Sequence, residues 1–93
     1  MNYKLYKFSA PWCGQCKVLA KRLEGFIPEN CEFTEIDVDE AEDEVLDKYQ
    51  IRNIPVTILL DEDEKIIKKW VGVFDTNEIE EEIKKAEAPQ END

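Results

Sequence analysis

The spacing of apolar residues along this 93-residue chain alternates between two patterns. In some segments every second residue is apolar, which is typical of a strand, and in others apolar residues recur every three or four positions, which is typical of a helix. Residues Tyr3–Ser9 alternate and are rich in aromatic side chains, so they predict a strand. Between residues 14 and 24 the apolar side chains recur at helical spacing, and Gly25 is placed to end that helix. Residues 32–37 predict a second strand. The chain therefore opens with a strand, a helix and another strand.

The rest of the chain continues this alternation. Residues 39–44 are acidic, as the first turn of a helix prefers, and the apolar face behind them runs to Tyr49. The stretch VTILL at Val56–Leu60 is dense in β-branched side chains and predicts a strand. A polar turn at residues 61–64 separates it from a further strand at residues 65–71, so these two strands should form a hairpin.

A last helix is predicted after the hairpin. Asp75 and Glu78 have the spacing of a capping box, with Asp in place of the usual Ser or Thr, and the helix should run to about Lys85. Residues 1–86 then form one domain, as the length suggests, and residues 87–93 form a flexible acidic tail.

The predicted order of elements is β-α-β-α-β-β-α. A strand–helix–strand opening implies a parallel pair joined by a right-handed crossover, whereas a hairpin adds antiparallel strands. The expected fold class is α/β, with a mixed four-stranded sheet that is covered by helices on both faces.

The charge balance of the chain argues against some classes of partner. It has 23 Asp and Glu against 12 Lys and Arg, a formal net charge of −11. Phosphate backbones and acidic lipid headgroups repel such a surface, so we expect no nucleic-acid and no membrane partner. We find no apolar run long enough for a signal-peptide core or a membrane span, so the default location is cytoplasmic. We expect a monomer whose charge serves solubility or steers it toward basic partner surfaces.

Two cysteines, Cys13 and Cys16, stand in the stretch SAPWCGQCK, where the first strand gives way to the first helix. A zinc site needs four ligands, but the chain has three cysteines and no histidine, and the third cysteine, Cys31, is isolated from the pair. A disulfide that closes so short a loop removes little chain entropy, so stability is a poor reason for this spacing. We therefore expect no metal and favour redox chemistry.

The position of the pair suits that chemistry. Cys13 would lie at the helix N-terminus, where free N–H groups and the macrodipole stabilise a thiolate. Cys16, one turn inside, can then attack a mixed disulfide held on Cys13. Gly14 and Gln15 would let the turn close. Trp12 would supply a flat apolar wall beside the sulfurs, or would serve as a partly buried packing residue.

Three separated motifs make the chain similar to the thioredoxin superfamily: APWCGQCK at residues 10–17, QIRNIPVT at residues 50–57 and WVGVF at residues 70–74. The resemblance implies a thioredoxin-like fold and a thiol–disulfide oxidoreductase that reduces disulfides in protein substrates. It also implies recharging by a flavin-dependent thioredoxin reductase, and no bound cofactor besides the redox-active disulfide of Cys13 and Cys16.

The resemblance also assigns roles to residues of this sequence. Cys13 would be the exposed nucleophile and Cys16 the resolving thiol. Pro55 would be cis and placed across from the cysteines, and the Ile54 backbone would bind an extended substrate segment. Gly72 would let the substrate approach closely. From the residues alone, Pro55 could instead be an ordinary trans residue that starts a strand, and Gly72 could be a simple strand-end glycine.

The chain departs from the family pattern in its core and in its active-site turn. Full-length thioredoxins begin with an extra strand and helix, so here residues 32–37 become a sheet edge. The acidic side chains Glu32, Glu35 and Asp37 would discourage edge-to-edge pairing there. Gln15 stands where thioredoxins usually have proline, so we expect a less reducing cysteine pair.

A third departure lies at Lys7, where the family has a buried aspartate that helps to deprotonate the resolving thiol. The family's neighbouring lysine lines up with Glu35, so the pair is charge-reversed. We expect Lys7 and Glu35 to face one another near Cys16 as a buried or half-buried ion pair, with Glu35 or water accepting the thiol proton. In the alternative, Lys7 extends its amine to solvent.

Two other functions stay open. A glutaredoxin, recharged by glutathione, usually shows a Gly-Gly-Asp stretch near the position of VGVFD, whereas here the single Gly72 precedes Val73. A non-enzymatic module of the same fold would bind a partner through the surface of Trp12, Ile54 and Gly72. Cys31 is expected to be a passive thiol, with a regulatory or intermolecular role as the alternative.

Overall fold

The computed structural model describes residues 2–88 of the chain and contains the predicted order of elements. These are β1 (Tyr3–Ser9), α1 (Gly14–Leu23), β2 (Cys31–Asp37), α2 (Asp43–Lys48), β3 (Val56–Leu60), β4 (Ile66–Val71) and α3 (Asn77–Glu87). Helix α2 begins within the acidic stretch that predicted it, at Asp43. Most of the predicted tail, residues 87–93, lies outside the described residues, so the boundary at residue 86 stays a prediction.

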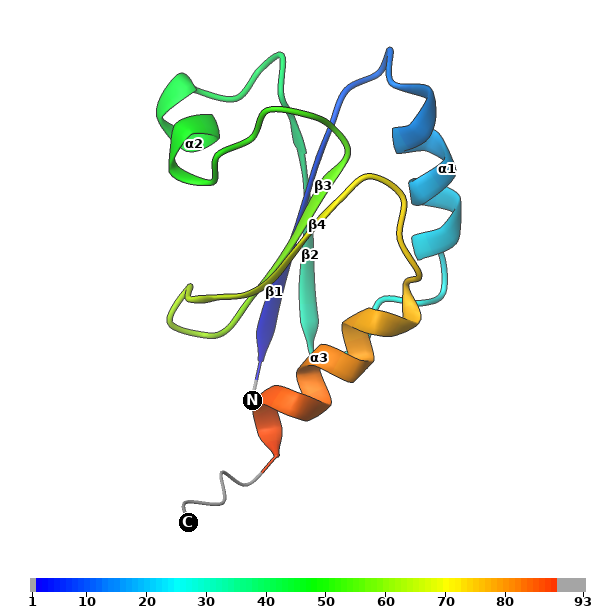
Figure 1. Cartoon of the computed structure of the whole chain (residues 1–93), viewed down its shortest axis with the longest axis vertical. Helices are drawn as coiled ribbons and strands as arrows, with labels where there is room; N and C mark the ends of the chain where they lie inside the picture. Colours follow the sequence, from blue (N-terminus) through cyan, green and yellow to red (C-terminus); the bar gives the residue numbers. More distant parts are fainter. Residues whose placement is uncertain (1, 89–93) are drawn as a thin grey trace.

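The strands form one mixed sheet in the order β2-β1-β3-β4. β1 pairs with β2 in parallel and with β3 antiparallel, and β3 pairs antiparallel with β4. Helix α2 covers one face of the sheet, and α1 and α3 cover the other (Figure 1). The predicted α/β fold, the mixed sheet and the position of β2 at an edge are therefore confirmed.

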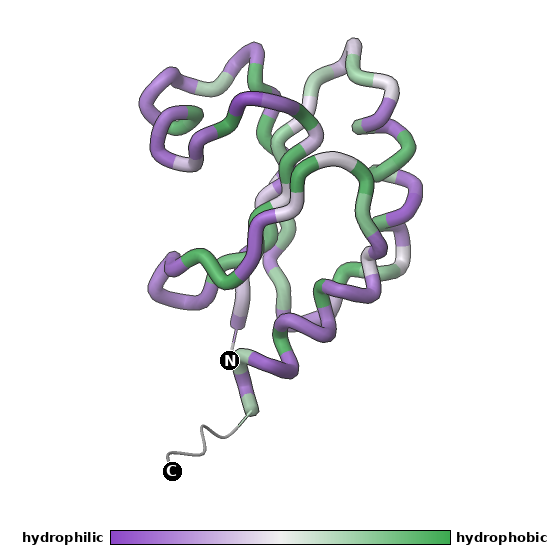
Figure 2. The backbone as a smooth tube through the Cα atoms, in the orientation of Figure 1, coloured by the Kyte–Doolittle hydropathy of each residue, from purple (hydrophilic) through white to green (hydrophobic). Residues whose placement is uncertain are grey.

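The two central strands, β1 and β3, form the middle of the core. Every residue of β3 is buried. Alternation along β1 directs Leu5 toward α1 and α3 and Phe8 toward α2, so the sheet separates two hydrophobic clusters. The larger cluster contains Tyr3, Leu5, Leu19, Leu23, Leu59, Trp70, Phe74, Ile79 and Ile83. Hydrophilic segments lie outside these strands, in α2, in the β3–β4 turn and along much of α3 (Figure 2).

Helix α1 ends as the sequence predicts. Gly25 lies two residues after Leu23, the last residue of the helix. It has a φ of +77°, a left-handed conformation that glycine adopts without a steric penalty. The N–H of Phe26 donates to the carbonyl of Leu23 at 3.0 Å and closes the turn.

The capping box predicted for the last helix is wrong. The N-terminal cap of α3 is Thr76, whose side chain makes no capping hydrogen bond. Glu78 does not reach back to the helix start, because its Oε1 accepts a hydrogen bond from the Trp70 indole of β4 at 3.3 Å. Asp75 Oδ1 instead accepts from the N–H of Asn77 at 3.0 Å. A tertiary contact thus takes the side chain that the local motif would use.

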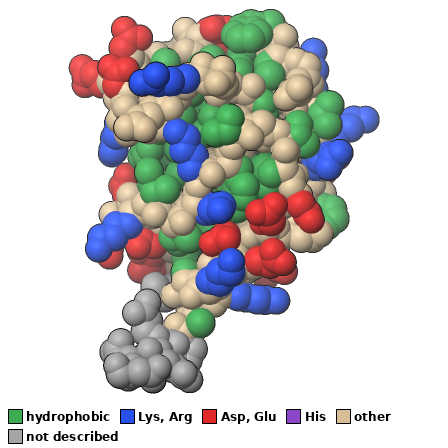
Figure 3. All heavy atoms as spheres, viewed as in Figure 1, with side chains coloured by type: hydrophobic (Ala, Val, Ile, Leu, Met, Phe, Trp, Pro, Cys, Tyr) green, Lys and Arg blue, Asp and Glu red, His purple; other side chains and the backbone are tan. Residues whose placement is uncertain are grey.

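Acidic side chains lie in more than one place on the face that Figure 3 shows. They are seen at the corner of the molecule over α2 and again lower on the face, near α3, with hydrophobic side chains exposed between them. No helix within residues 2–88 has the length and the apolar character needed to cross a membrane.

Candidate active site

The cysteine pair lies at the junction between β1 and α1, as predicted. Cys13 is the N-terminal cap of α1 and has an extended backbone conformation. Cys16 lies one turn inside the helix, and the two Sγ atoms are joined in a disulfide across a Cα–Cα distance of 5.3 Å. The N–H of Cys16 donates to Cys13 Sγ at 3.1 Å. The free N–H groups and the macrodipole of α1 are therefore directed at Cys13 and favour negative charge on its sulfur.

The prediction that Cys13 is exposed is wrong for this disulfide form. Cys13 is 7% exposed and Cys16 is 3% exposed, so the nucleophile candidate is only slightly more accessible than its partner. The cause is packing: both cysteines form a small cluster with Ala10, against which Val38 and Ile54 lie. Access to the disulfide is thus confined to a narrow part of the surface.

Trp12 is not a packing residue, because its side chain is 69% exposed. Its indole Nε1 donates a 2.8 Å hydrogen bond to Oδ2 of Asp39, in the loop that follows β2. This role of Asp39 was not predicted from the sequence. The available signal was topological, since the carboxyl ends of two parallel strands meet at the same edge of a sheet.

Ile54, Pro55 and Gly72, the predicted substrate-binding residues, lie together, and Ile54 lies beside the cysteines. The Ile54–Pro55 peptide bond is cis, as the resemblance implies, and Ile54 packs against the cluster that contains both cysteines. The N–H of Gly72 donates to the carbonyl of Pro55 at 2.8 Å. Gly72 has a φ of +86°, and a Cβ built there would meet no atom of this chain within 4 Å. The surface beside Gly72 is therefore open.

Gly14 and Gln15 are the first two residues of α1, and both are exposed. Gly14 does not have a left-handed backbone, and a Cβ built on it would meet nothing within 4 Å. The closing of the turn therefore does not require glycine at this position, which corrects the role predicted for Gly14.

Lys7 and Glu35 form the predicted ion pair, and both line a cleft that Cys16 also lines. They are register partners on β1 and β2, and Lys7 Nζ lies 2.8 Å from Glu35 Oε2. The Lys7 side chain is 2% exposed and that of Glu35 is 53% exposed, so the pair is half-buried. The alternative, in which Lys7 extends its amine to solvent, is therefore wrong. The hydroxyl of Ser9 donates to the same Glu35 oxygen at 3.0 Å.

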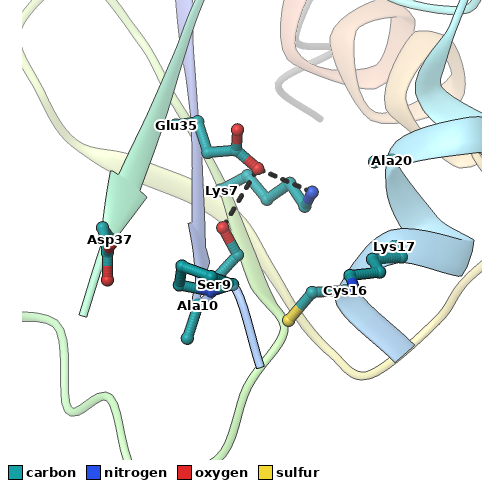
Figure 4. A pocket seen from close by; sticks show the side chains of 9 residues that line it. Lys7, Ser9, Ala10, Cys16, Lys17, Ala20, Glu35 and Asp37 are labelled. Atoms are coloured by element: carbon teal, nitrogen blue, oxygen red, sulfur yellow. Dashed lines mark hydrogen bonds and ion pairs between the residues drawn. The ribbon is translucent and has the colours of Figure 1, made fainter. Parts of the chain in front are cut away.

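This ion pair lines a cleft that reaches Cys16. The cleft has a volume of about 330 Å³ and is also lined by Asp37 of β2 and Lys17 of α1. Figure 4 shows Lys7 and Glu35 joined on the strand side of the cleft and Cys16 entering it from α1. The hydrogen bond from Lys7 lowers the pKa of the Glu35 carboxyl, and the bond from Ser9 adds to this effect, while burial opposes it.

A second residue whose role was not predicted from the sequence is Lys69 on β4. Its Nζ donates to the backbone carbonyls of Tyr49 and Gln50 at 3.0 and 3.1 Å. Gln50 has a φ of +54°, so Lys69 holds a left-handed turn at the start of the segment that leads to Ile54. Only the three-dimensional pairing of β4 with β3 brings this lysine to the end of α2.

The third cysteine, Cys31, lies at the start of β2, far along the strand from the active-site edge. It is half-buried against the larger hydrophobic cluster, and burial raises the pKa of its thiol to about 11. Within residues 2–88, no group of three or more His, Cys, Asp or Glu side chains is placed to hold a metal ion.

The fold and the position of the cysteine pair agree with comparisons against known proteins. The Thioredoxin family model matches residues 2–85. This chain belongs to the thioredoxin family. Thioredoxin from Mycoplasmoides gallisepticum is 37% identical over 79 residues, which covers 83% of this chain and 77% of that protein. Thioredoxin from Bacillus subtilis is 36% identical over 84 residues, with coverage of 87% and 79%.

Among solved structures, a mutant thioredoxin from Halobacterium salinarum matches with a TM-score of 0.78 at 25% identity, covering 97% of this chain and 79% of that one. The family membership, together with the paired Cys13 and Cys16 at the start of α1, makes this protein a thiol–disulfide oxidoreductase. Members of this family act on disulfides in proteins, so protein disulfides are its class of substrate.

Proposed function

We propose that this thioredoxin-family enzyme reduces protein disulfides, with Cys13 as the nucleophile and Cys16 as the resolving thiol. The observation that carries this assignment is the placement of the two sulfurs on α1. Cys13 is the helix cap and receives the N–H of Cys16, whereas Cys16 is a helical residue in the first turn. A helix N-terminus stabilises a thiolate, so Cys13 is the sulfur suited to attack first.

The reaction is two successive thiol–disulfide exchanges. The Cys13 thiolate attacks a substrate sulfur, which breaks the substrate disulfide and forms a mixed disulfide. The released substrate sulfur takes up a proton. The Cys16 thiolate then attacks Cys13 Sγ, the second substrate sulfur leaves, and the Cys13–Cys16 disulfide forms. Two electrons pass from the dithiol to the substrate.

We assign the substrate-binding surface to Ile54, Pro55 and Gly72, with Trp12 at its border. Ile54 lies against the cysteine cluster, and the space next to Gly72 is open. An extended substrate segment could pair with the backbone here in the manner of an added strand. The narrow access to Cys13 would then favour disulfides in mobile, extended segments over disulfides buried in a folded protein.

The reductant that we propose is a thioredoxin reductase that uses NADPH, and the enzyme would need no bound cofactor, because the Cys13–Cys16 disulfide itself carries the electrons. The proposed location is the cytoplasm, where thiols are kept reduced, and the proposed state is a monomer. Relatives also include mitochondrial thioredoxins, such as the bovine protein, of which this chain covers 48%.

The test is reduction of insulin disulfides, with NADPH and a bacterial thioredoxin reductase in one arm and with glutathione, glutathione reductase and NADPH in the other. We expect turnover in the first arm, its loss in Cys13→Ser, and its retention in the matched control Cys31→Ser. Turnover in the glutathione arm alone would indicate a glutaredoxin. A Cys13→Ser variant that retains every function of the wild type would indicate a non-enzymatic module.

The expectation that Gln15 makes the pair less reducing stays a prediction. Gln15 is the second residue of α1, a position that leaves its N–H without a helical acceptor and so tolerates proline. Equilibration with glutathione buffers should give a potential above that of thioredoxins, about −270 mV. We expect Gln15→Pro to lower it, and a wild-type value at or below about −270 mV contradicts the expectation.

A further inference from the structure

The buried member of the ion pair in the cleft that Cys16 lines is the cation, Lys7. Of the two partners in the ion pair, Lys7 is 2% exposed and Glu35 is 53% exposed. Lys7 therefore holds its ammonium inside the protein, while the Glu35 carboxylate faces water. Both line the cleft that Cys16 also lines (Figure 4).

This unequal burial decides the sign of the electrostatic potential at Cys16. A charge in water is strongly screened, whereas a charge in the protein interior acts on its neighbours through a lower dielectric constant. The carboxylate thus cancels only part of the field of the ammonium inside the cleft. We therefore expect a positive electrostatic potential at a sulfur that enters the cleft from α1, which favours the thiolate over the thiol.

The other groups that face this cleft do not reverse that sign. From α1, Lys17 adds a second cation, and Glu24, at the opposite end of the helix from Cys16, lines a separate cleft with Lys7 and Glu35. From β2, Asp37 adds an anion, but it lies at the strand end, where its Oδ1 accepts the N–H of Asp39 at 2.9 Å. From β3, the residue opposite Lys7 is Thr57, which carries no charge. Its buried hydroxyl has no hydrogen-bond partner within residues 2–88.

We propose that the buried ammonium of Lys7 stabilises the Cys16 thiolate, so that Cys16 gives its proton to water and no carboxylate acts as the base. This proposal rests on the proposed function, in which Cys16 resolves the mixed disulfide. The thiolate formed in this way attacks Cys13 Sγ, the Cys13–Cys16 bond forms, and the bond from Cys13 to the substrate breaks. The substrate sulfur leaves with the electron pair.

Glu35 is the rival candidate for accepting the proton, and its contacts argue against it. One of its oxygens already accepts hydrogen bonds from both Lys7 and Ser9, at 2.8 and 3.0 Å. These bonds also lower the pKa of the carboxyl, which makes it a weaker base toward a thiol. Its function here is to hold the Lys7 ammonium in place.

The experiment separates the two sulfur reactions by stopped-flow with Ellman's reagent, a small aromatic disulfide whose thiol product absorbs visible light. Attack by Cys13 releases the first product thiol at a rate that depends on reagent concentration. Attack by Cys16 releases the second at a rate that does not. A Cys31→Ser background leaves only these two thiols. The rate of the second phase is measured from acidic to alkaline pH.

We expect Lys7→Met to move the pH midpoint of the second phase upward by about one unit, and to slow that phase about tenfold near neutral pH. The first phase should keep its rate. Lys7→Arg, which retains the cation, should restore the midpoint. The matched control is Lys4→Met on the same strand, because Lys4 lies on the opposite face of the sheet and pairs with Glu64 at 3.4 Å.

Glu35→Gln and Asp37→Asn decide between the field of Lys7 and a carboxylate base. Under the proposal, neither variant raises the midpoint, because Lys7 keeps its charge in both and the amide oxygen introduced by Glu35→Gln still accepts the hydrogen bond from Lys7. An unchanged midpoint in Lys7→Met, or a tenfold loss of the second phase in either carboxylate variant, overturns the proposal. Failure of the proposed function looks different: Cys16→Ser would then fail to retain the aromatic thiol on Cys13. Circular dichroism at each pH shows that every variant is folded.

Discussion

The Trp12 indole donates a 2.8 Å hydrogen bond to the carboxylate of Asp39, and this contact ties the loop after β1 to the loop after β2. It is the only side-chain hydrogen bond that holds Trp12 within the described part of the chain, and the ring is otherwise largely exposed. The bond therefore sets the position of a large apolar surface next to the cysteine pair.

Removal of this bond should weaken protein disulfide reduction. We expect Asp39→Ala to lower kcat/KM for insulin by about 3- to 10-fold, because a solvent-exposed hydrogen bond such as this one contributes on the order of 1 kcal/mol. Asp39→Asn retains an acceptor oxygen and should lose less. The control Glu40→Ala removes an equal charge one residue later. Equal activity in Asp39→Ala and Glu40→Ala would show that the bond does not matter for the substrate.

The fold was predictable because local patterns and tertiary structure agree along most of this chain. Strands with β-branched or alternating side chains became the sheet, and the parallel pairing of β1 with β2 placed Lys7 opposite Glu35. The cysteines were predictable as a pair at a helix start, since a residue's place in a helix depends on near neighbours.

What could not be predicted depends on contacts between distant segments. Asp39 was interpreted only as part of an acidic helix start, because nothing local links it to Trp12. Glu78 has a capping-box spacing but contacts Trp70 of β4 instead. The low exposure of Cys13 results from packing by residues from other loops, such as Ile54. In each case a tertiary partner determines where the side chain lies.

Glu35 should make the stability of the protein depend on pH. Hydrogen bonds from Lys7 and Ser9 lower its pKa in the folded state. A lowered folded-state pKa contributes stability above the unfolded value, about 4.3, and this contribution is lost as pH falls through the folded value. Glu35→Gln cannot titrate, so its free energy of unfolding should fall less than that of the wild type between neutral pH and about pH 3.

Urea denaturation at the two pH values measures this difference. Glu32→Gln is the matched control, because Glu32 lies on the same edge strand and forms none of the ion pairs found within residues 2–88. A Glu35→Gln variant that loses as much stability as the wild type and the Glu32→Gln control would contradict the assignment.

Cys31 should be the least reactive thiol of the reduced protein. Burial raises its pKa to about 11, so only a very small fraction is thiolate near neutral pH. We expect iodoacetamide at neutral pH to alkylate Cys13 first and Cys31 last, with each site followed by peptide mass spectrometry. Unfolding in urea should remove the difference. Labelling of Cys31 at the rate of Cys13 in the folded protein would favour a regulatory thiol over a passive one.

Gly72 and Gly25 offer a matched pair that separates backbone strain from substrate contact. Both have a left-handed φ, +86° and +77°, and a Cβ at either would meet no atom of this chain within 4 Å. Alanine at either position should therefore lower the free energy of unfolding by a similar amount, roughly 1 kcal/mol. If a substrate backbone approaches Gly72, only Gly72→Ala should raise KM for insulin, by about tenfold or more, because its methyl group would occupy the open space beside the Pro55 carbonyl. An equal KM for insulin in the two variants would show that Gly72 is needed only for the backbone conformation and does not contact the substrate.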